Sequence, residues 1–203
     1  MKTSERKLLR KMIESITIPP RKDENNPISK KCFRPAELKE IVKAERTLGF
    51  TLPNAVRDIF LKVGNGGFGP EYGIVGIKGG AKLDGCTLET CYAKMRKLEK
   101  ENAVWRWPER LLPLANYGCG MWACVDCEYQ RLPMILWDPN NLSAELEGNE
   151  ARLNWGNSFW DQGRSLRAWL IDWLDQRSSP EPKWPSESWL KKRLGFALPR
   201  IKM

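Results

Sequence analysis

Apolar residues recur at intervals of three and four along much of the chain, the spacing of a helix that buries one face. We therefore predict helices over five stretches: 4–16, 35–48, 53–63, 87–100 and 165–177. A shorter helix is predicted after Ser186, whose hydroxyl can cap its amino end, and it should end near Leu194. Gly49 and Gly195 stand where a helix end needs a left-handed backbone, and Pro53 suits a first helical turn.

Short runs of apolar and β-branched residues predict strands. Residues 74–77 form one such run, and residues 121–128 and 134–137 form a hairpin around a short polar reversal. Apolar and polar side chains alternate at 153–155, which predicts an edge strand. Residues 140–150 are polar and acidic and are predicted to form a loop. Most of the predicted sheet thus comes from the second half of the chain.

A glycine-rich run, Gly-Asn-Gly-Gly-Phe-Gly, occupies residues 64–69. Glycine adopts positive φ without steric cost, so the run is suited to reversing the chain. A phosphate-binding loop is the alternative interpretation. Such a loop follows a strand and ends on Gly-Lys-Ser/Thr, whereas this run follows a predicted helix and lacks that ending. Chain reversal is therefore favoured.

Three blocks of motifs stand out along the chain. The first contains Glu45, Leu48-Gly49-Phe50, Leu52-Pro53 and Asn65-Gly66-Gly67-Phe68. The second contains Leu112-Pro113-Leu114-Ala115, Tyr117-Gly118-Cys119-Gly120, Cys124-Val125-Asp126-Cys127 and the run from Pro133 to Pro139. The third is Ser158-Phe159-Trp160, leading into the predicted helix at 165–177. In these motifs the chain resembles the SUKH superfamily, which includes the yeast cell-wall assembly regulators and many bacterial immunity proteins.

The resemblance implies an α+β fold. A central, mainly antiparallel sheet would carry an N-terminal helix pair and a C-terminal helix packed on it. We expect three parts: a basic N-terminal helix and linker at 1–34, the SUKH-like domain at 35–177, and a basic C-terminal extension with a short helix at 178–203. The helix at 4–16 is expected to dock on its own domain, and binding to a membrane surface or a partner is the alternative.

The formal net charge of +9 is carried by the two ends of the chain. Residues 1–31 hold nine Lys/Arg against four Asp/Glu, and residues 183–203 hold six against one, so each end carries +5 and the stretch between them −1. The basic ends are interpreted as solvated surface charge or as a means of attracting an acidic partner surface. Nucleic-acid binding is not favoured, because it usually places charge on a folded face with groove-reading elements.

The chain has six cysteines and no histidine. The absence of histidine excludes Ser-His-Asp and Cys-His catalysis and every zinc site that uses histidine. Cys124 and Cys127 form a C-x-x-C motif, with Cys119 five residues before it. Because side chains three apart on a strand point to opposite faces, reduced and partly buried thiols are favoured over a structural zinc site.

Asp126, Glu128 and Asp138 are carboxylates near the predicted hairpin. Paired carboxylates can perform acid–base chemistry, but solvated or turn-capping carboxylates are far more common. We therefore expect a protein that is not an enzyme and that needs no cofactor, no metal and no small-molecule substrate.

The resemblance implies a bacterial immunity protein that binds and neutralises a cognate protein toxin, for which nucleases are one candidate class. The expected contacts lie on the concave side of the sheet and its rim: Tyr72, Trp122, Glu128 and Trp137. The alternatives are an interaction scaffold of the cell-wall regulator type and a nucleic-acid binder acting through the basic ends. With neither a signal peptide nor an apolar run of the ~18 residues that a membrane helix needs, a cytoplasmic protein without membrane contact is expected.

Overall fold

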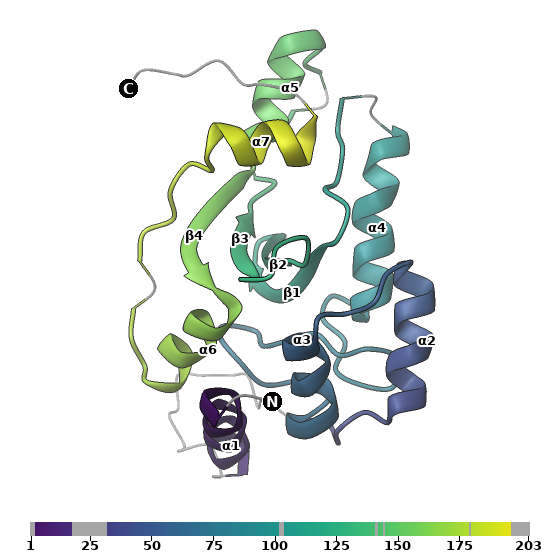
Figure 1. The fold of residues 1–203 in the computed structure, drawn as a ribbon. Coiled ribbons are helices and arrows are strands. Elements are labelled where there is room, and N and C mark those ends of the chain that lie inside the picture. Colours follow the sequence, from purple (N-terminus) through teal and green to yellow (C-terminus); the bar gives the residue numbers. More distant parts are fainter. Residues whose placement is uncertain are drawn as a thin grey trace.

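The computed structural model describes residues 3–17, 32–101, 104–140, 142–143, 145–178 and 180–195, so most of the predicted linker lies outside the described residues. The helices are α1 (Thr3–Thr17), α2 (Leu38–Leu48), α3 (Asn54–Asp58), the π-helix η1 (Ile59–Val63), α4 (Leu88–Glu101), α5 (Gly148–Gly156), α6 (Leu166–Leu174) and α7 (Glu187–Leu194). The strands are β1 (Leu111–Gly118), β2 (Met121–Asp126), β3 (Pro133–Trp137) and β4 (Phe159–Ser165). Figure 1 shows how these elements are arranged.

The four strands form one sheet in the order β1-β2-β3-β4, and every neighbouring pair is antiparallel. Short connections between consecutive strands allow this meander, because an antiparallel pair needs only a tight reversal. The expected α+β fold with a central antiparallel sheet is therefore confirmed.

One face of the sheet is filled by aromatic rings. Trp122 lies opposite Trp137, which lies opposite Phe159, and side chains of paired residues share a face. Rings from α5, α7 and the segment before β1 pack on that face, and the set is Trp107, Trp122, Trp137, Trp155, Phe159 and Trp189. Centroid separations of 5.2–5.9 Å and tilted or edge-on contacts are the geometry that aromatic pairs prefer.

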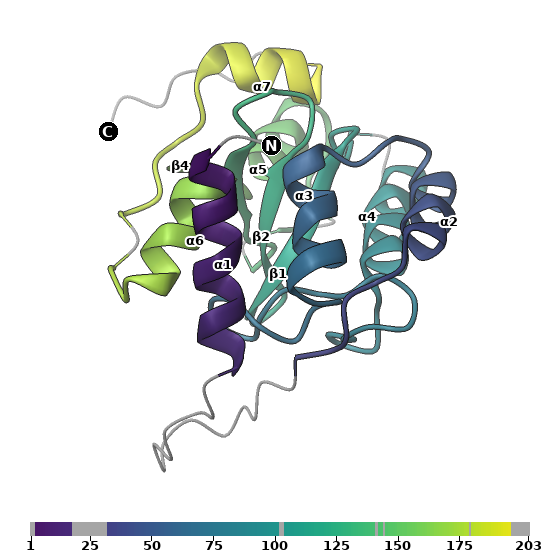
Figure 2. The same cartoon turned by 60° about the horizontal axis from the view of Figure 1, so that its bottom comes forward.

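The other side of the sheet is covered by α1, the α3–η1 segment and α6, which lie in front of the strands in Figure 2. α1 packs against η1 and α6. Its side chains Leu9 and Met12 are buried in the core, and basic residues stay on its outer side. The prediction that the first helix docks on its own domain is confirmed.

Several predicted helix ends are also confirmed. Gly49 closes α2 with φ of 81°, and Gly195 closes α7 with φ of 76°, both in the left-handed region that glycine adopts freely. The Ser186 hydroxyl accepts a hydrogen bond of 3.2 Å from the Trp189 N–H at the start of α7. Local capping chemistry thus fixes these boundaries.

Two predicted strands are absent from the described structure. Residues 74–77 form a single bridge, Ile74 to Ala115, instead of a strand, since glycines interrupt the run. Residues 153–155 lie in α5, which also takes the end of the predicted loop at 140–150. In α5, the buried residues Ala151 and Trp155 are four residues apart, which is a helical spacing. The alternation at 153–155 was too short to distinguish a strand from this helix. β4 was not predicted from the sequence either.

Both outer edges of the sheet are paired with irregular segments. Beside β1, the Val75 N–H donates to the Leu114 carbonyl at 2.9 Å. Beside β4, Asp161 and Lys183 exchange two backbone hydrogen bonds of 2.7 and 2.8 Å. The second contact holds the segment before α7 beside β4, so residues 180–195 of the predicted C-terminal extension pack on the sheet.

Candidate functional site

Two of the four expected partner contacts lie in the core. Trp122 and Trp137 are each 5% exposed. The Trp137 ring meets Trp107 edge-on at 5.3 Å and Trp155 at 6.3 Å. The sheet face that was expected to receive a partner is covered by α5, α7 and the segment before β1, so a partner reaches little of either indole.

Glu128 lies just after β2 and is exposed. Its carboxylate is 3.9 Å from Arg110 and 4.0 Å from Lys192 of α7. Tyr72 lies near the opposite end of β2, a separation of about 20 Å from the rise of a strand. The four expected residues therefore do not form one surface.

Tyr72 is 46% exposed. Its backbone N–H donates to the Asn116 carbonyl at 3.3 Å, which ties the loop at 68–73 to β1. Its ring lies over Gly118, where an added β-carbon would come within 3.0 Å of Tyr72 Cε2. Glycine at position 118 therefore leaves room for the Tyr72 ring beside the turn between β1 and β2.

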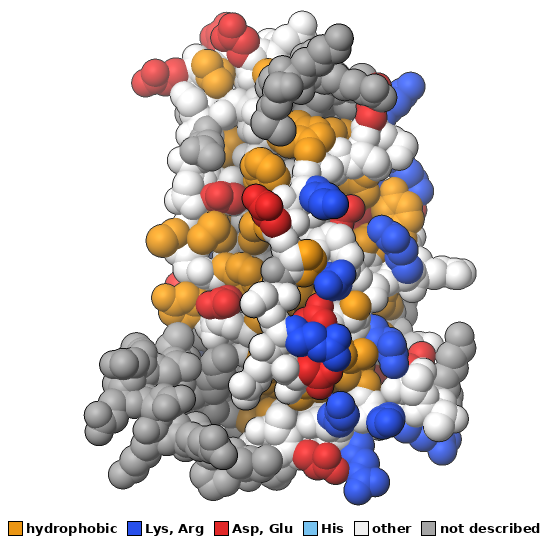
Figure 3. All heavy atoms as spheres, turned by 90° about the vertical axis from the view of Figure 1, so that its left-hand side faces the viewer, with side chains coloured by type: hydrophobic (Ala, Val, Ile, Leu, Met, Phe, Trp, Pro, Cys, Tyr) orange, Lys and Arg blue, Asp and Glu red, His pale blue; other side chains and the backbone are white. Residues whose placement is uncertain are grey.

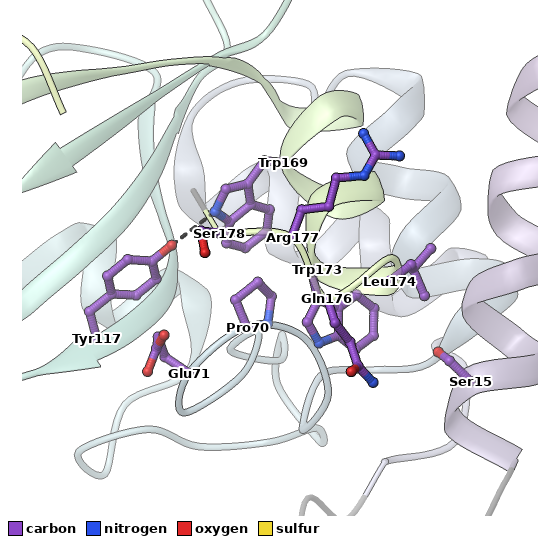
Figure 4. Close-up of a pocket in the computed structure, with 10 residues that line it drawn as sticks. All are labelled: Ser15, Pro70, Glu71, Tyr117, Trp169, Trp173, Leu174, Gln176, Arg177 and Ser178. Carbon is purple, nitrogen blue, oxygen red and sulfur yellow. Dashed lines mark hydrogen bonds between the residues drawn. The ribbon is translucent and has the colours of Figure 1, made fainter. Parts of the chain in front are cut away.

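A pocket of about 600 Å³ opens beside this loop. Its walls come from the 68–73 loop, β1, the end of α6 and the end of α1: Ser15, Pro70, Glu71, Tyr117, Trp169, Trp173, Leu174, Gln176, Arg177 and Ser178. Figure 4 shows Tyr117 and Glu71 on one side of the pocket and Trp173 and Gln176 on the other, with Pro70 between them. This is a concave surface with aromatic walls and a few polar groups, as binding sites commonly are.

The aromatic wall of the pocket is held rigidly. The Trp169 indole N–H donates to the Tyr117 hydroxyl at 2.9 Å (Figure 4). Burial raises the pKa of Tyr117 above its ordinary value, so the phenol stays neutral. Trp173 packs on Phe68 with ring centroids 6.3 Å apart. Tyr117, Trp169 and Trp173 are therefore fixed in position before any partner arrives.

Most charges around the pocket neutralise one another. Arg177 pairs with Asp172 at 3.8 Å and also with Asp175, and Lys11 of α1 lies 3.5 Å from Asp175. Arg164 donates to Asp172 at 2.7 Å. Figure 3 shows acidic and basic side chains intermingled on the face of the molecule that carries β4 and α6. Glu71 differs, since it has no ion pair with any residue that the structure describes.

The backbone is strained on two sides of the pocket. Glu71 has φ of 47° and Gln176 has φ of 53°. A residue other than glycine rarely adopts positive φ, and such residues cluster at functional sites because the fold must hold them there. A third residue, Cys119, has φ of 49° in the adjoining β1–β2 turn. Two such residues thus line the pocket, and others, such as Asp84, Arg110 and Leu132, lie elsewhere in the described chain.

The carboxylates near the hairpin are engaged in structural contacts. Asp126 is fully buried and receives hydrogen bonds from Arg193 at 3.0 and 3.1 Å and from the Trp189 indole at 2.9 Å. Burial raises the pKa of Asp126, and the charge of Arg193 opposes that rise. Asp138 accepts from the Asn140 backbone N–H at 3.0 Å, a turn-capping role.

The cysteines are free thiols, and Cys86, Cys91, Cys124 and Cys127 are buried. Burial raises the pKa of Cys124 well above its ordinary value and that of Cys127 to about 12. Thiols with raised pKa values are poor nucleophiles at neutral pH. Within the described ranges, no three His, Cys, Asp or Glu side chains are grouped so that they could hold a metal ion.

The pocket itself was not predicted from the sequence. Trp169 and Trp173 lie on the apolar stripe of a predicted helix, where tryptophan is normally core. Tyr117 belongs to one of the motif blocks, and Glu71 is adjacent to Tyr72. The sequence feature that could have pointed to the pocket was a pair of tryptophans one helical turn apart, close to a charged helix end. That feature does not show which loop forms the other wall of the pocket.

An antiparallel sheet with helices over both faces and an aromatic pocket at its rim defines a small α+β domain with a preformed surface site. The chain belongs to the SMI1 / KNR4 family (SUKH-1), whose family model matches residues 35–161. The resemblance to the SUKH superfamily is therefore confirmed. No curated protein matches the chain in a sequence comparison. No helix that the structure describes has both the length and the apolar character needed to cross a membrane.

The matched segment ends inside β4. It includes the 68–73 loop and β1, but α1, α6 and α7 lie outside it. One wall of the pocket therefore belongs to the family domain, and the opposite wall is built by residues before and after it, from α1 and from α6 and the residues that follow α6.

Proposed function

We propose that this chain is a non-catalytic binding protein, and specifically a bacterial immunity protein that occupies a cognate toxin and blocks its action. The observation that carries the proposal is the preformed aromatic pocket beside exposed Tyr72, in a member of the SMI1 / KNR4 family. Tyrosine and tryptophan are enriched among the residues that dominate binding energy. Neutralisation by occlusion needs complementary surface and no reactive group.

The hairpin carboxylates and buried thiols support a role without chemistry. Asp126 is used to anchor α7, Asp138 caps a turn, and the thiols of the C-x-x-C motif are protonated and buried. We place the partner surface at the pocket and Tyr72, with Glu128 as a separate outlying contact, and we propose a cytoplasmic location. The buried indoles of Trp122 and Trp137 serve as core in this proposal.

Affinity capture with the tagged full chain tests the proposal. The bait is incubated with the protein encoded directly upstream of its gene, and bound proteins are identified by mass spectrometry. We expect capture of a toxin domain at nanomolar affinity and loss of toxicity on co-expression. A Tyr72→Ala variant should bind at least about tenfold more weakly, as expected for a hot-spot aromatic.

Two other results of the capture experiment would contradict the immunity proposal. Capture of wall-regulatory proteins with no toxin would replace the immunity proposal by an interaction scaffold of the cell-wall regulator type. Recovery of nucleic acid alone, lost at raised salt, would favour binding through the basic ends.

A further inference from the structure

We propose that the aromatic pocket binds one cationic side chain, a lysine or an arginine, that projects from the partner protein. This inference rests on the proposed function, because it names the chemistry by which the partner is recognised. It is carried by three properties of the pocket: its aromatic walls, the carboxylate of Glu71 and the ion pairs that engage the basic side chains beside it.

The aromatic walls suit a cation. Three rings line the pocket, those of Tyr117, Trp169 and Trp173. Trp169 is only 1% exposed, so the accessible aromatic surface comes from the partly exposed Tyr117 and Trp173. The faces of tyrosine and tryptophan attract an ammonium or guanidinium group, with tryptophan the stronger of the two. The aliphatic stem of lysine or arginine can lie along the same rings while its charged end stays near the mouth. The volume of about 600 Å³ leaves room for such a chain together with water.

Glu71 supplies the negative charge. Its carboxylate lies beside Tyr117 at the pocket wall (Figure 4). The charge of Glu71 contributes, after burial, to the raised pKa of Tyr117, so its field reaches the phenol. The turn that carries it is closed by a hydrogen bond of 2.8 Å from the Gly73 N–H to the Pro70 carbonyl. Glu71 is thus preorganised at positive φ, with no competing ion pair among the described residues.

The basic residues nearby do not cancel this preference. Lys11 and Arg177 share Asp175, and Arg177 also lies within 3.8 Å of Asp172. Both basic side chains are therefore engaged in ion pairs, whereas Glu71 has none among the described residues. A basic side chain of a partner would therefore contact the Glu71 carboxylate at the pocket, even though the whole chain carries a net charge of +9.

Small probes test the pocket without any knowledge of the partner. The full chain is titrated with butylguanidinium chloride and butylammonium chloride, and with neutral butylurea as the isosteric control, while the indole N–H signals are followed by NMR. We expect the signals of Trp169 and Trp173 to shift with millimolar affinity for the two cations and little change with butylurea. Glu71→Gln should weaken cation binding about fivefold, and Glu128→Gln, at the far end of β2, should leave it unchanged.

Equal binding of butylurea, or equal affinity of Glu71→Gln and the original chain, would overturn the inference. A second experiment separates it from the proposed function. If a toxin is captured and Glu71→Arg weakens capture at least tenfold, both stand. If a toxin is captured and Glu71→Arg has no effect, the immunity proposal stands and the cation inference fails. If the cations bind but no protein is captured, the pocket chemistry stands and the proposed function fails.

Discussion

Asp126 is a fully buried carboxylate at the end of β2, and it is held by two side chains from α7. Arg193, whose side chain is 7% exposed, donates from two nitrogens, and Trp189 donates from its indole. A buried ion pair contributes little net stability, but removal of one partner leaves a costly unpaired charge. This triad therefore fixes where α7 sits.

Replacement of Arg193 by methionine should lower the free energy of unfolding by about 3 kcal/mol, because the Asp126 carboxylate would stay buried without its counter-ion. Urea unfolding followed by tryptophan fluorescence measures the change. Lys192→Met is the matched control, since the Lys192 amine is exposed and 4.0 Å from Glu128, and it should cost less than about 1 kcal/mol. Equal costs for the two variants would contradict the role of the triad.

The buried thiols should make the protein sensitive to alkali. An unfolded thiol ionises near 9.0, whereas the pKa of Cys127 is about 12 in the fold. Stability is therefore fully present below pH 9 and falls as pH rises toward 12, because the unfolded chain releases a proton that the folded chain retains. The slope is at most about 1.4 kcal/mol per pH unit for each such thiol.

Urea midpoints at pH 8 and pH 10.5 check this expectation. Cys127→Ala should be less stable than the original chain at pH 8, and it should lose less stability between the two pH values. Parallel losses in the two proteins would show that Cys127 does not carry the effect.

At the scale of elements, the turn after η1 depends on close backbone approach. An added β-carbon at Gly66 would lie 2.6 Å from both the Ile74 carbonyl and the Gly76 nitrogen, and φ there is 79°. In the same buried turn, the side-chain oxygen of Asn65 accepts a hydrogen bond of 2.8 Å from the Ile77 N–H. The Asn-Gly-Gly sequence is thus required by the path of the chain, which agrees with its interpretation as a reversal.

Gly66→Ala should therefore cost more than about 3 kcal/mol, since the clash adds to the cost of positive φ. Gly85→Ala is the control, because Gly85 has φ of 72° but open space around its α-carbon, and it should cost about 1 kcal/mol. Thermal unfolding by circular dichroism measures both. A smaller loss in Gly66→Ala than in Gly85→Ala would contradict the steric account.

Elements with a strong local signal were predictable, and those fixed by distant contacts were not. The stripe of α2 and the Ser186 cap of α7 can be read from neighbouring residues. β4 contains Asp161, Gln162 and Gly163, and its extended form depends on pairing with β3 and with Lys183. The burial of Trp122 depends on elements that lie far along the chain, so the local sequence pattern did not show it.

At the scale of the whole molecule, α7 of the C-terminal extension packs on the family domain. Trp189, Leu190 and Leu194 of α7 are buried against the core formed by the family domain. Full burial of one large apolar side chain contributes about 2 kcal/mol. The extension therefore stabilises the sheet face beneath it.

A chain truncated after Arg177 should lose α7 and expose the aromatic face of the sheet. We expect strong binding of a hydrophobic dye, red-shifted tryptophan emission and a broad, weakly cooperative unfolding transition. The full-length chain measured in parallel is the control. A truncated chain with unchanged emission and a sharp transition would show that the family domain is self-sufficient.

The pairing at both outer edges of the sheet limits how other chains can associate with this one. Strand addition needs a row of free backbone N–H and C=O groups along an edge. Val75 already bonds to β1, and Lys183 already bonds to β4, so those positions offer no template. Recognition is left to side chains, whose identity can change without altering the backbone ladder. The same edge pairing disfavours aggregation, because the sheets of two copies of the protein cannot pair edge to edge at these positions, even at high protein concentration.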